Sequence, residues 1–120
     1  MAHVLVVDDE VYIRELIKKT LAPQGHNVVE ASNGHEAIKT LGTHAVDIAI
    51  VDLVMPEKGG LETLMEIRDF NHRIKLIAIS GKIQTGGDSI KGLAQQFQID
   101  AVLAKPFDVD ELIQLVQDMS

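Results

Sequence analysis

The sequence predicts an α/β fold with a single doubly wound, five-stranded parallel sheet and five helices. Apolar runs of strand length alternate with segments whose apolar residues recur at helical spacing, and the alternation occurs five times in 120 residues. Strands separated by single helices run parallel with right-handed crossovers, which places helices on both faces of the sheet. The apolar residues are mostly aliphatic, with no Trp, one Tyr and three Phe, as is typical of buried parallel strands.

In the first half of the chain, helix-end and turn signals separate the predicted strands from the predicted helices. Strands are predicted over residues 3–7, 28–29 and 47–52, and helical apolar faces over residues 13–21 and 37–41. Pro23 and Gly25 end the first helix, and Asn33-Gly34 marks the turn before the second. These signals predict the first two strand–helix units and the third strand.

The second half of the chain shows the same alternation of predicted strands and helices. Strands are predicted over residues 76–79 and 101–104, and helical apolar faces over residues 61–70, 90–97 and 109–119. A proline and a glycine pair make residues 55–60 a loop, and a loop over 84–87 leads to a helix cap at Asp88 or Ser89. Asp108 is the predicted cap of the last helix, directly after the stop at Pro106.

Composition indicates one domain over residues 1–120, without an output domain. The net charge of −7 and the scattered basic residues disfavour direct binding to nucleic acid or to an anionic membrane. The chain has no Cys, which excludes disulfides and thiolate metal sites. Because we find neither a signal peptide nor a membrane-spanning stretch, we expect a cytoplasmic protein.

Four predicted strands end in polar residues of different chemical kinds. These residues are Asp8, Asp9, Asp52, Ser80 and Lys105. In a sheet of order 2-1-3-4-5 the strand order reverses between the first and third strands, and ligands bind outside their carboxyl ends. We therefore expect three carboxylates, a hydroxyl and an ammonium to gather at one edge of the sheet.

This set of side chains predicts a site for a divalent cation and a phosphoryl group. Crowded carboxylates repel one another unless a cation lies among them, and Mg²⁺ prefers oxygen ligands. We expect Asp9 and Asp52 to bind Mg²⁺ directly and Asp8 to bind it through water. Asp52 can act as the nucleophile toward phosphorus, while Lys105 and Ser80 contact the phosphoryl oxygens.

At these residues the chain resembles the receiver domain of bacterial two-component response regulators, including its chemotaxis members, whose fold is flavodoxin-like. The resemblance covers essentially the whole chain. The fragments that carry it are Val-Val-Asp-Asp-Glu10, Asn-Gly-His-Glu-Ala37, Val-Asp52-Leu-Val-Met-Pro56, Gly60-Leu, Ile-Ser80-Gly and Leu-Ala-Lys105-Pro-Phe107. Each fragment alone is weakly specific, but their combination in this order is highly specific.

The resemblance implies a two-component signalling domain that is phosphorylated on Asp52 by a histidine kinase or a histidine phosphotransfer protein. It implies Mg²⁺ bound by Asp9, Asp52 and the backbone carbonyl of Val54, and a cis bond between Lys105 and Pro106. The phosphorylated domain would act on a downstream protein or a tethered output domain, as a monomer or as a phosphorylation-dependent dimer. It would not turn over a substrate as an enzyme, because it catalyses only its own phosphorylation and dephosphorylation.

Three features depart from the family's pattern. Val102 stands where the family usually carries an aromatic side chain that turns inward on phosphorylation. The segment between Ser80 and Lys105 is long and contains several glycines, so we expect residues 81–92 to carry the conformational switch instead. Val54 cannot orient a water molecule as a polar side chain would, which predicts slow hydrolysis of the phosphoryl group.

Two other functions share parts of this pattern. A phosphohydrolase with an aspartyl nucleophile would need a second acid two residues after Asp52, where this chain has Val54. A flavin mononucleotide protein would need a hydroxyl- and glycine-rich loop after the first strand, where this chain has Asp8-Asp9-Glu10. The five histidines share no ligand spacing, so we assign them surface or packing roles.

Overall fold

A computed structural model describes residues 1–53, 59–81 and 95–120. Its five-stranded parallel sheet has the order β2-β1-β3-β4-β5, as predicted. The strands are β1 (His3–Val7), β2 (Asn27–Ala31), β3 (Ile48–Asp52), β4 (Lys75–Ser80) and β5 (Ala101–Ala104). The strand order confirms that the reversal lies between β1 and β3, where the sequence places its acidic residues.

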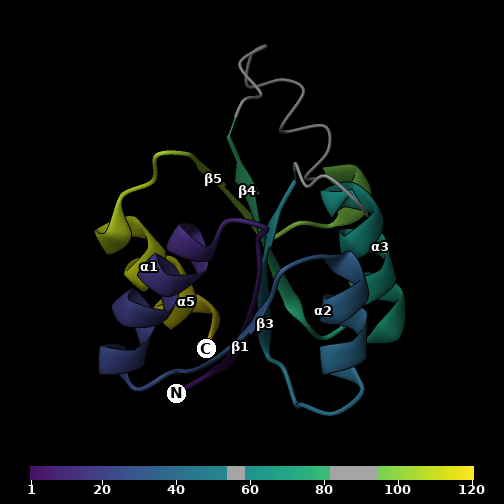
Figure 1. The fold of residues 1–120 in the computed structure, drawn as a ribbon, viewed down its shortest axis with the longest axis horizontal. Helices are drawn as coiled ribbons and strands as arrows, with labels where there is room; N and C mark the ends of the chain where they lie inside the picture. Colours follow the sequence, from purple (N-terminus) through teal and green to yellow (C-terminus); the bar gives the residue numbers. More distant parts are fainter. Residues whose placement is uncertain (54–58, 82–94) are drawn as a thin grey trace.

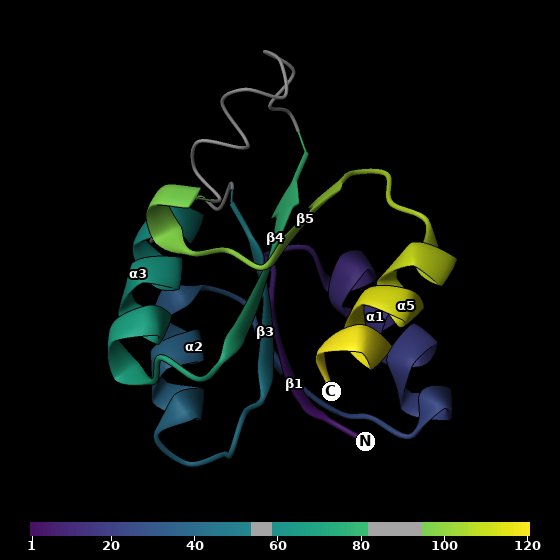
Figure 2. The ribbon, with the colours of Figure 1, turned by 180° about the vertical axis from the view of Figure 1, so that it is seen from behind.

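Helices cover both faces of the sheet (Figures 1 and 2). One face carries α1 (Val11–Leu21) and α5 (Val109–Met119), and the other carries α2 (Gly34–Leu41) and α3 (Gly60–Phe70). Of the fourth predicted helix only residues 95–97 are described, and they are helical. Its start, the loop over residues 84–87 and most of the loop over residues 55–60 lie outside the described residues.

The core consists of two apolar layers, one on each side of the sheet. Alternate residues of the central strands enter opposite layers, so Leu5 packs toward α2 and α3 while Val4 packs toward α1 and α5. All five residues of β3 are buried. A strand buried on both faces holds the residue at its carboxyl end, Asp52, in a fixed place.

Side chains cap α2 and α5: the cap at Asp108 is as predicted, whereas Asn33 was predicted only as a turn residue. The Asn33 side chain accepts a hydrogen bond from the Glu36 N–H at 2.9 Å, and Glu36 Oε1 accepts one from the Ser32 N–H at 2.8 Å. The bond from Ser32 lowers the pKa of Glu36 below its usual value. The Asp108 side chain caps α5 by accepting from the Asp110 N–H at 2.9 Å. β1 and β5 have the predicted bounds, and β3 begins one residue later than predicted. β2 and β4 extend by one or two residues past the predicted runs, because ladder pairing continues beyond the apolar residues.

Gly60 is required by the contact between α3 and the end of β3. A Cβ atom at Gly60 would overlap the Asp52 carbonyl oxygen and the Leu53 backbone. We therefore expect Gly60→Ala to lower the free energy of unfolding by about 2–3 kcal/mol, as overpacking against backbone does. Gly59→Ala is the matched control, because a Cβ there meets nothing within 4 Å. Equal urea midpoints for the two variants would contradict this prediction.

His26 has a packing role, in line with the sequence interpretation. Its side chain is buried, with 7% exposure, and Nδ1 accepts a hydrogen bond from the Ala2 N–H at 3.0 Å. Burial, aided by the positive N-terminus, lowers the pKa of His26 below its usual value of 6.5. The folded protein therefore favours the neutral imidazole.

This lowered pKa predicts an acid-sensitive stability. Below pH 6.5 the unfolded chain takes up a proton at His26 that the folded chain excludes, so stability is complete above this pH and falls below it. We expect a loss of about 1 kcal/mol by pH 5.5, comparable to the one hydrogen bond that protonation breaks. Urea unfolding at pH 7.5 and 5.5 measures it. His26→Gln should flatten this pH dependence, whereas His44→Gln, at an exposed site, should leave it unchanged.

Candidate functional site

The carboxyl ends of β1, β3, β4 and β5 meet at one edge of the sheet. Asp8 directly follows β1, Asp52 and Ser80 are the last residues of β3 and β4, and Lys105 directly follows β5. The strand register pairs Asp52 with Ile79 and Ser80 with Ala104. The structure thus gathers residues that are up to 97 positions apart, Asp8 and Lys105, into one place.

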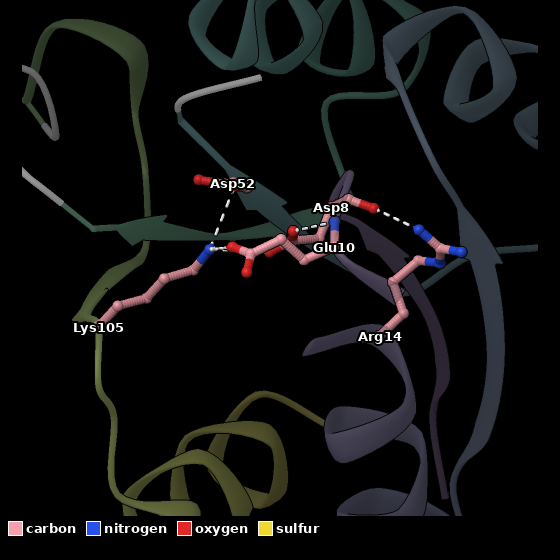
Figure 3. Close-up of polar contacts among 5 residues, drawn as sticks. All are labelled: Asp8, Glu10, Arg14, Asp52 and Lys105. Carbon is pink, nitrogen blue, oxygen red and sulfur yellow. Dashed lines mark hydrogen bonds and ion pairs between the residues drawn. The ribbon is translucent and has the colours of Figure 1, made fainter. Parts of the chain in front are cut away.

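The Lys105 ammonium lies among three carboxylates (Figure 3). Its Nζ atom is 3.0 Å from Glu10 Oε1, 3.2 Å from Asp8 Oδ2 and 3.3 Å from Asp52 Oδ2. It donates hydrogen bonds to Glu10 and Asp52, while its contact with Asp8 is an ion pair. Within the described residues, three negative charges thus share one positive charge, which leaves this part of the cluster with an excess of negative charge.

Burial and charge shift the protonation of this cluster. Burial raises the pKa of Asp8, and the nearby charge of Asp52 raises it further, although the Glu10 N–H and Lys105 oppose the shift. Burial alone would lower the pKa of Lys105, but the hydrogen bond to Glu10 and the charges of Asp8 and Asp52 raise it above its usual value. Lys105 therefore stays charged, and the negative charge of Asp8 is held at an energetic cost.

Asp8 is positioned by contacts on several sides. Its N–H donates to the Ala31 carbonyl at 3.2 Å, and its Oδ1 accepts from the Glu10 N–H at 2.9 Å. Its carbonyl accepts from Arg14 Nη1 at 2.7 Å, and Arg14 in turn pairs with Glu30 at 3.1 Å. The turn between β1 and α1 is thus fixed to the neighbouring strand β2 and to the first helix.

The carboxylates of Asp8, Glu10 and Asp52 form a group that could hold a metal ion. One oxygen from each lies within 4.8 Å of the others. This donor set is made only of oxygens and carries excess negative charge, and Asp8 Oδ2 has no hydrogen bond within the described ranges. Such a set suits a hard divalent cation. Glu10 was not predicted as a member of this group, although it directly follows the acidic pair Asp8-Asp9 in the sequence.

The other predicted site residues, Asp9, Val54 and Ser80, do not belong to this group of carboxylates. Asp9 is exposed, and it is outside this group of carboxylates in the part of the chain that the structure describes. The backbone carbonyl of Val54 lies outside the described residues. Ser80 is 3% exposed, and within the described ranges its Oγ has no hydrogen-bond partner. A buried hydroxyl without a partner is energetically costly, which suits a group that a ligand would satisfy.

Backbone geometry joins Ser80 to Lys105. The Lys105 N–H donates to the Ser80 carbonyl at 2.9 Å, and the Lys105-Pro106 bond is cis, as the resemblance implies. Val102 is partly buried and packs against the apolar layer on the α3 side of the sheet. No helix in the described ranges has the length and apolar character needed to cross a membrane.

Comparisons with known proteins agree with this arrangement. The family model for the response regulator receiver domain matches residues 4–117. The chemotaxis protein CheY of Bacillus subtilis is 33% identical over 97% of this chain and 96% of its own length. The sensor kinase/phosphatase CqsS of Vibrio cholerae is 38% identical over 95% of this chain, which spans 17% of that protein.

A solved structure gives the same result. The response regulator TrrA of Thermotoga maritima, determined with Mg²⁺ and BeF, has a TM-score of 0.84 and 34% identity, with complete coverage of both chains. Similarity to CheY and to this regulator favours a receiver over an aspartyl phosphohydrolase. The fold, the strand-end residues and the family match together show that this chain belongs to the response regulator receiver domain family.

Proposed function

We propose that this receiver domain accepts a phosphoryl group on Asp52 from a phosphohistidine in a Mg²⁺-dependent reaction. The observation that carries the proposal is the position of Lys105 Nζ, 3.3 Å from Asp52 Oδ2 and 3.2 Å from Asp8 Oδ2. An ammonium at this point can neutralise the charge on a phosphoryl group bonded to Asp52. The side chain of Asp52 is 4% exposed, so the acceptor has one defined orientation at the end of β3.

In the proposed reaction an Asp52 carboxylate oxygen forms a bond to phosphorus as the phosphorus–nitrogen bond of the donor breaks. The donor imidazole leaves with the electron pair of that bond. Lys105 and the Ser80 hydroxyl donate hydrogen bonds to the phosphoryl oxygens, which gives the buried Ser80 Oγ a partner. Hydrolysis by water later returns Asp52 to the free carboxylate, slowly because Val54 orients no water.

In this proposal Mg²⁺ would be held by Asp9, Asp52 and the Val54 carbonyl, with Asp8 acting through water. Asp9 would therefore have to turn toward the group that Asp8, Glu10 and Asp52 form. When bound, the cation supplies positive charge that offsets the excess negative charge of the cluster. Asp8 and Asp52 are buried carboxylates at 0% and 4% side-chain exposure, so a cation would also relieve the cost of their burial.

Receiver domains interact with histidine kinases and with downstream targets. We assign this chain a histidine kinase or a histidine phosphotransfer protein as its donor, and a downstream protein or a tethered output domain as its target. The net charge of −7 supports a protein partner over nucleic acid. We place the protein in the cytoplasm, as a monomer or a phosphorylation-dependent dimer.

Incubation with acetyl phosphate and Mg²⁺, followed by intact mass measurement, tests this function. We expect one phosphoryl group on the wild-type chain and none on Asp52→Ala or on wild type without a divalent cation. Asp47→Ala, which removes an exposed carboxylate elsewhere, is the control and should be modified like wild type. No adduct on wild type, or an adduct that persists in Asp52→Ala, would overturn the proposal.

A further inference from the structure

Glu10 occupies a helix cap position without acting as a cap. It is the N-cap residue of α1, but its side chain makes no capping hydrogen bond, and the first turn of α1 has no acidic residue. Asp, Asn, Ser and Thr are the residues that normally cap a helix from this position. The Glu10 carboxylate extends instead toward the end of β5 and meets Lys105 at 3.0 Å (Figure 3).

Glu10 also differs in burial from the other two carboxylates around Lys105. The side chains of Asp8 and Asp52 are 0% and 4% exposed, whereas that of Glu10 is 57% exposed. If Lys105 turned away, Glu10 could be solvated by water, but Asp8 and Asp52 would remain as buried charges. Glu10 is thus the partner that Lys105 can exchange at the lowest cost.

The pair borders an open cavity beside the acidic cluster. Glu10 and Lys105 line a cavity of about 490 Å³ together with Tyr12, Gly81 and Phe107. Asp52 is not among the described residues that line this cavity, but Lys105, which contacts Asp52 at 3.3 Å, is. An anionic phosphodonor that approached Asp52 from this side would be repelled by the Glu10 carboxylate and would compete with it for the Lys105 ammonium.

We propose that Glu10 is the counter-ion of Lys105 in the unphosphorylated protein and restrains phosphorylation by small anionic donors. Lys105 exchanges the Glu10 carboxylate for phosphoryl oxygens when Asp52 is modified, and Glu10 is then released to solvent. Glu10 is a positioning residue, because it acts through Lys105. This inference rests on the proposed function, since it assumes that Asp52 accepts the phosphoryl group.

Phosphorylation rates of Glu10→Gln test the restraint. With acetyl phosphate at saturating Mg²⁺, we expect the variant to react about 3- to 10-fold faster than wild type, the size of one nearby unit charge at a solvated site. The excess should shrink as salt rises, because screening weakens the repulsion. Glu15→Gln removes the same charge from an exposed position on the same helix and should react like wild type.

A second readout does not depend on phosphorylation. In metal-free protein, a double-mutant cycle of Glu10→Gln and Lys105→Met reports the contact through urea unfolding. We expect the two substitutions to be non-additive. Glu10→Gln removes an ion pair in wild type, whereas in Lys105→Met it only relieves repulsion from Asp8 and Asp52, so it should raise the unfolding midpoint more in Lys105→Met than in wild type.

These measurements separate the two ideas. If wild type incorporates no phosphoryl group, the proposed function fails and this inference fails with it. If wild type is phosphorylated, the inference alone is overturned by a Glu10→Gln rate equal to or below wild type, by equal acceleration in Glu15→Gln, or by an additive cycle.

Discussion

Lys105→Met is expected to lower the free energy of unfolding by about 2 kcal/mol at neutral pH in the absence of divalent cations, somewhat less than the loss of a partner costs a fully buried ion pair. Methionine keeps most of the apolar stem but removes the only positive charge that the structure places among Asp8, Glu10 and Asp52 in its described ranges. Asp8 then remains buried beside Asp52 with the Glu10 N–H but without a counter-ion there. Urea unfolding at pH 7.5 with a chelator measures the change.

The pH dependence of this variant gives a further check. Burial already raises the pKa of Asp8, and loss of Lys105 removes a contact that opposes the shift. The charged form of Asp8 therefore costs the variant more stability than it costs wild type, and protonation removes this cost. We expect the deficit to shrink as the pH falls into the acid range where Asp8 is protonated. Lys19→Met, at an exposed site on α1, is the control, and an equal loss there would contradict the explanation.

Asp8→Asn is expected to act in the opposite direction, raising the free energy of unfolding by about 1 kcal/mol in metal-free protein. An asparagine keeps the shape of the side chain and can accept the Glu10 N–H at Oδ1, but it removes a buried charge whose raised pKa marks it as destabilising. The gain should be largest at neutral pH and vanish in acid, where Asp8 in wild type is itself protonated.

The same variant is expected to lose the stabilisation by Mg²⁺. A cation at ten times its dissociation constant would stabilise wild type by about 1.4 kcal/mol. Asp8→Asn weakens the site, so the same Mg²⁺ concentration should raise its thermal midpoint much less. Asp69→Asn, at an exposed carboxylate on α3, should respond to Mg²⁺ like wild type. If Asp8→Asn destabilises the metal-free protein, the buried charge of Asp8 is not a net cost to the fold, and the prediction is wrong.

Much of this fold could be predicted because its signals are local. The apolar run of β3 is buried on both faces, and a run of that kind between two helical patterns specifies a central parallel strand. The caps at Asn33 and Asp108 were also predictable, because each side chain bonds to a backbone group within three residues. The convergence of Asp8, Asp52, Ser80 and Lys105 then followed from the topology of a parallel sheet.

Other features depend on distances that only the folded chain fixes. Glu10 joins the cluster because β5 ends within reach of the turn after β1, although 95 positions separate Glu10 from Lys105. Turn signals treat Gly59 and Gly60 alike, as two loop residues, and the resemblance singles out Gly60 without giving a physical reason. Only the packing of α3 against the Asp52 carbonyl makes Gly60 indispensable and leaves Gly59 replaceable.

The hydrogen bond from the Lys105 N–H to the Ser80 carbonyl connects the ends of β4 and β5 at the site. Two groups proposed to contact the phosphoryl group are tied together through their main chains, so a displacement of one strand end is passed to the other. Beyond Lys105 the chain continues through Pro106 to Phe107, which lines the cavity shared with Tyr12. If Asp52 is phosphorylated as proposed, a displacement of Lys105 would be carried along this stretch of backbone to the molecular surface, and this route would need no aromatic ring at position 102.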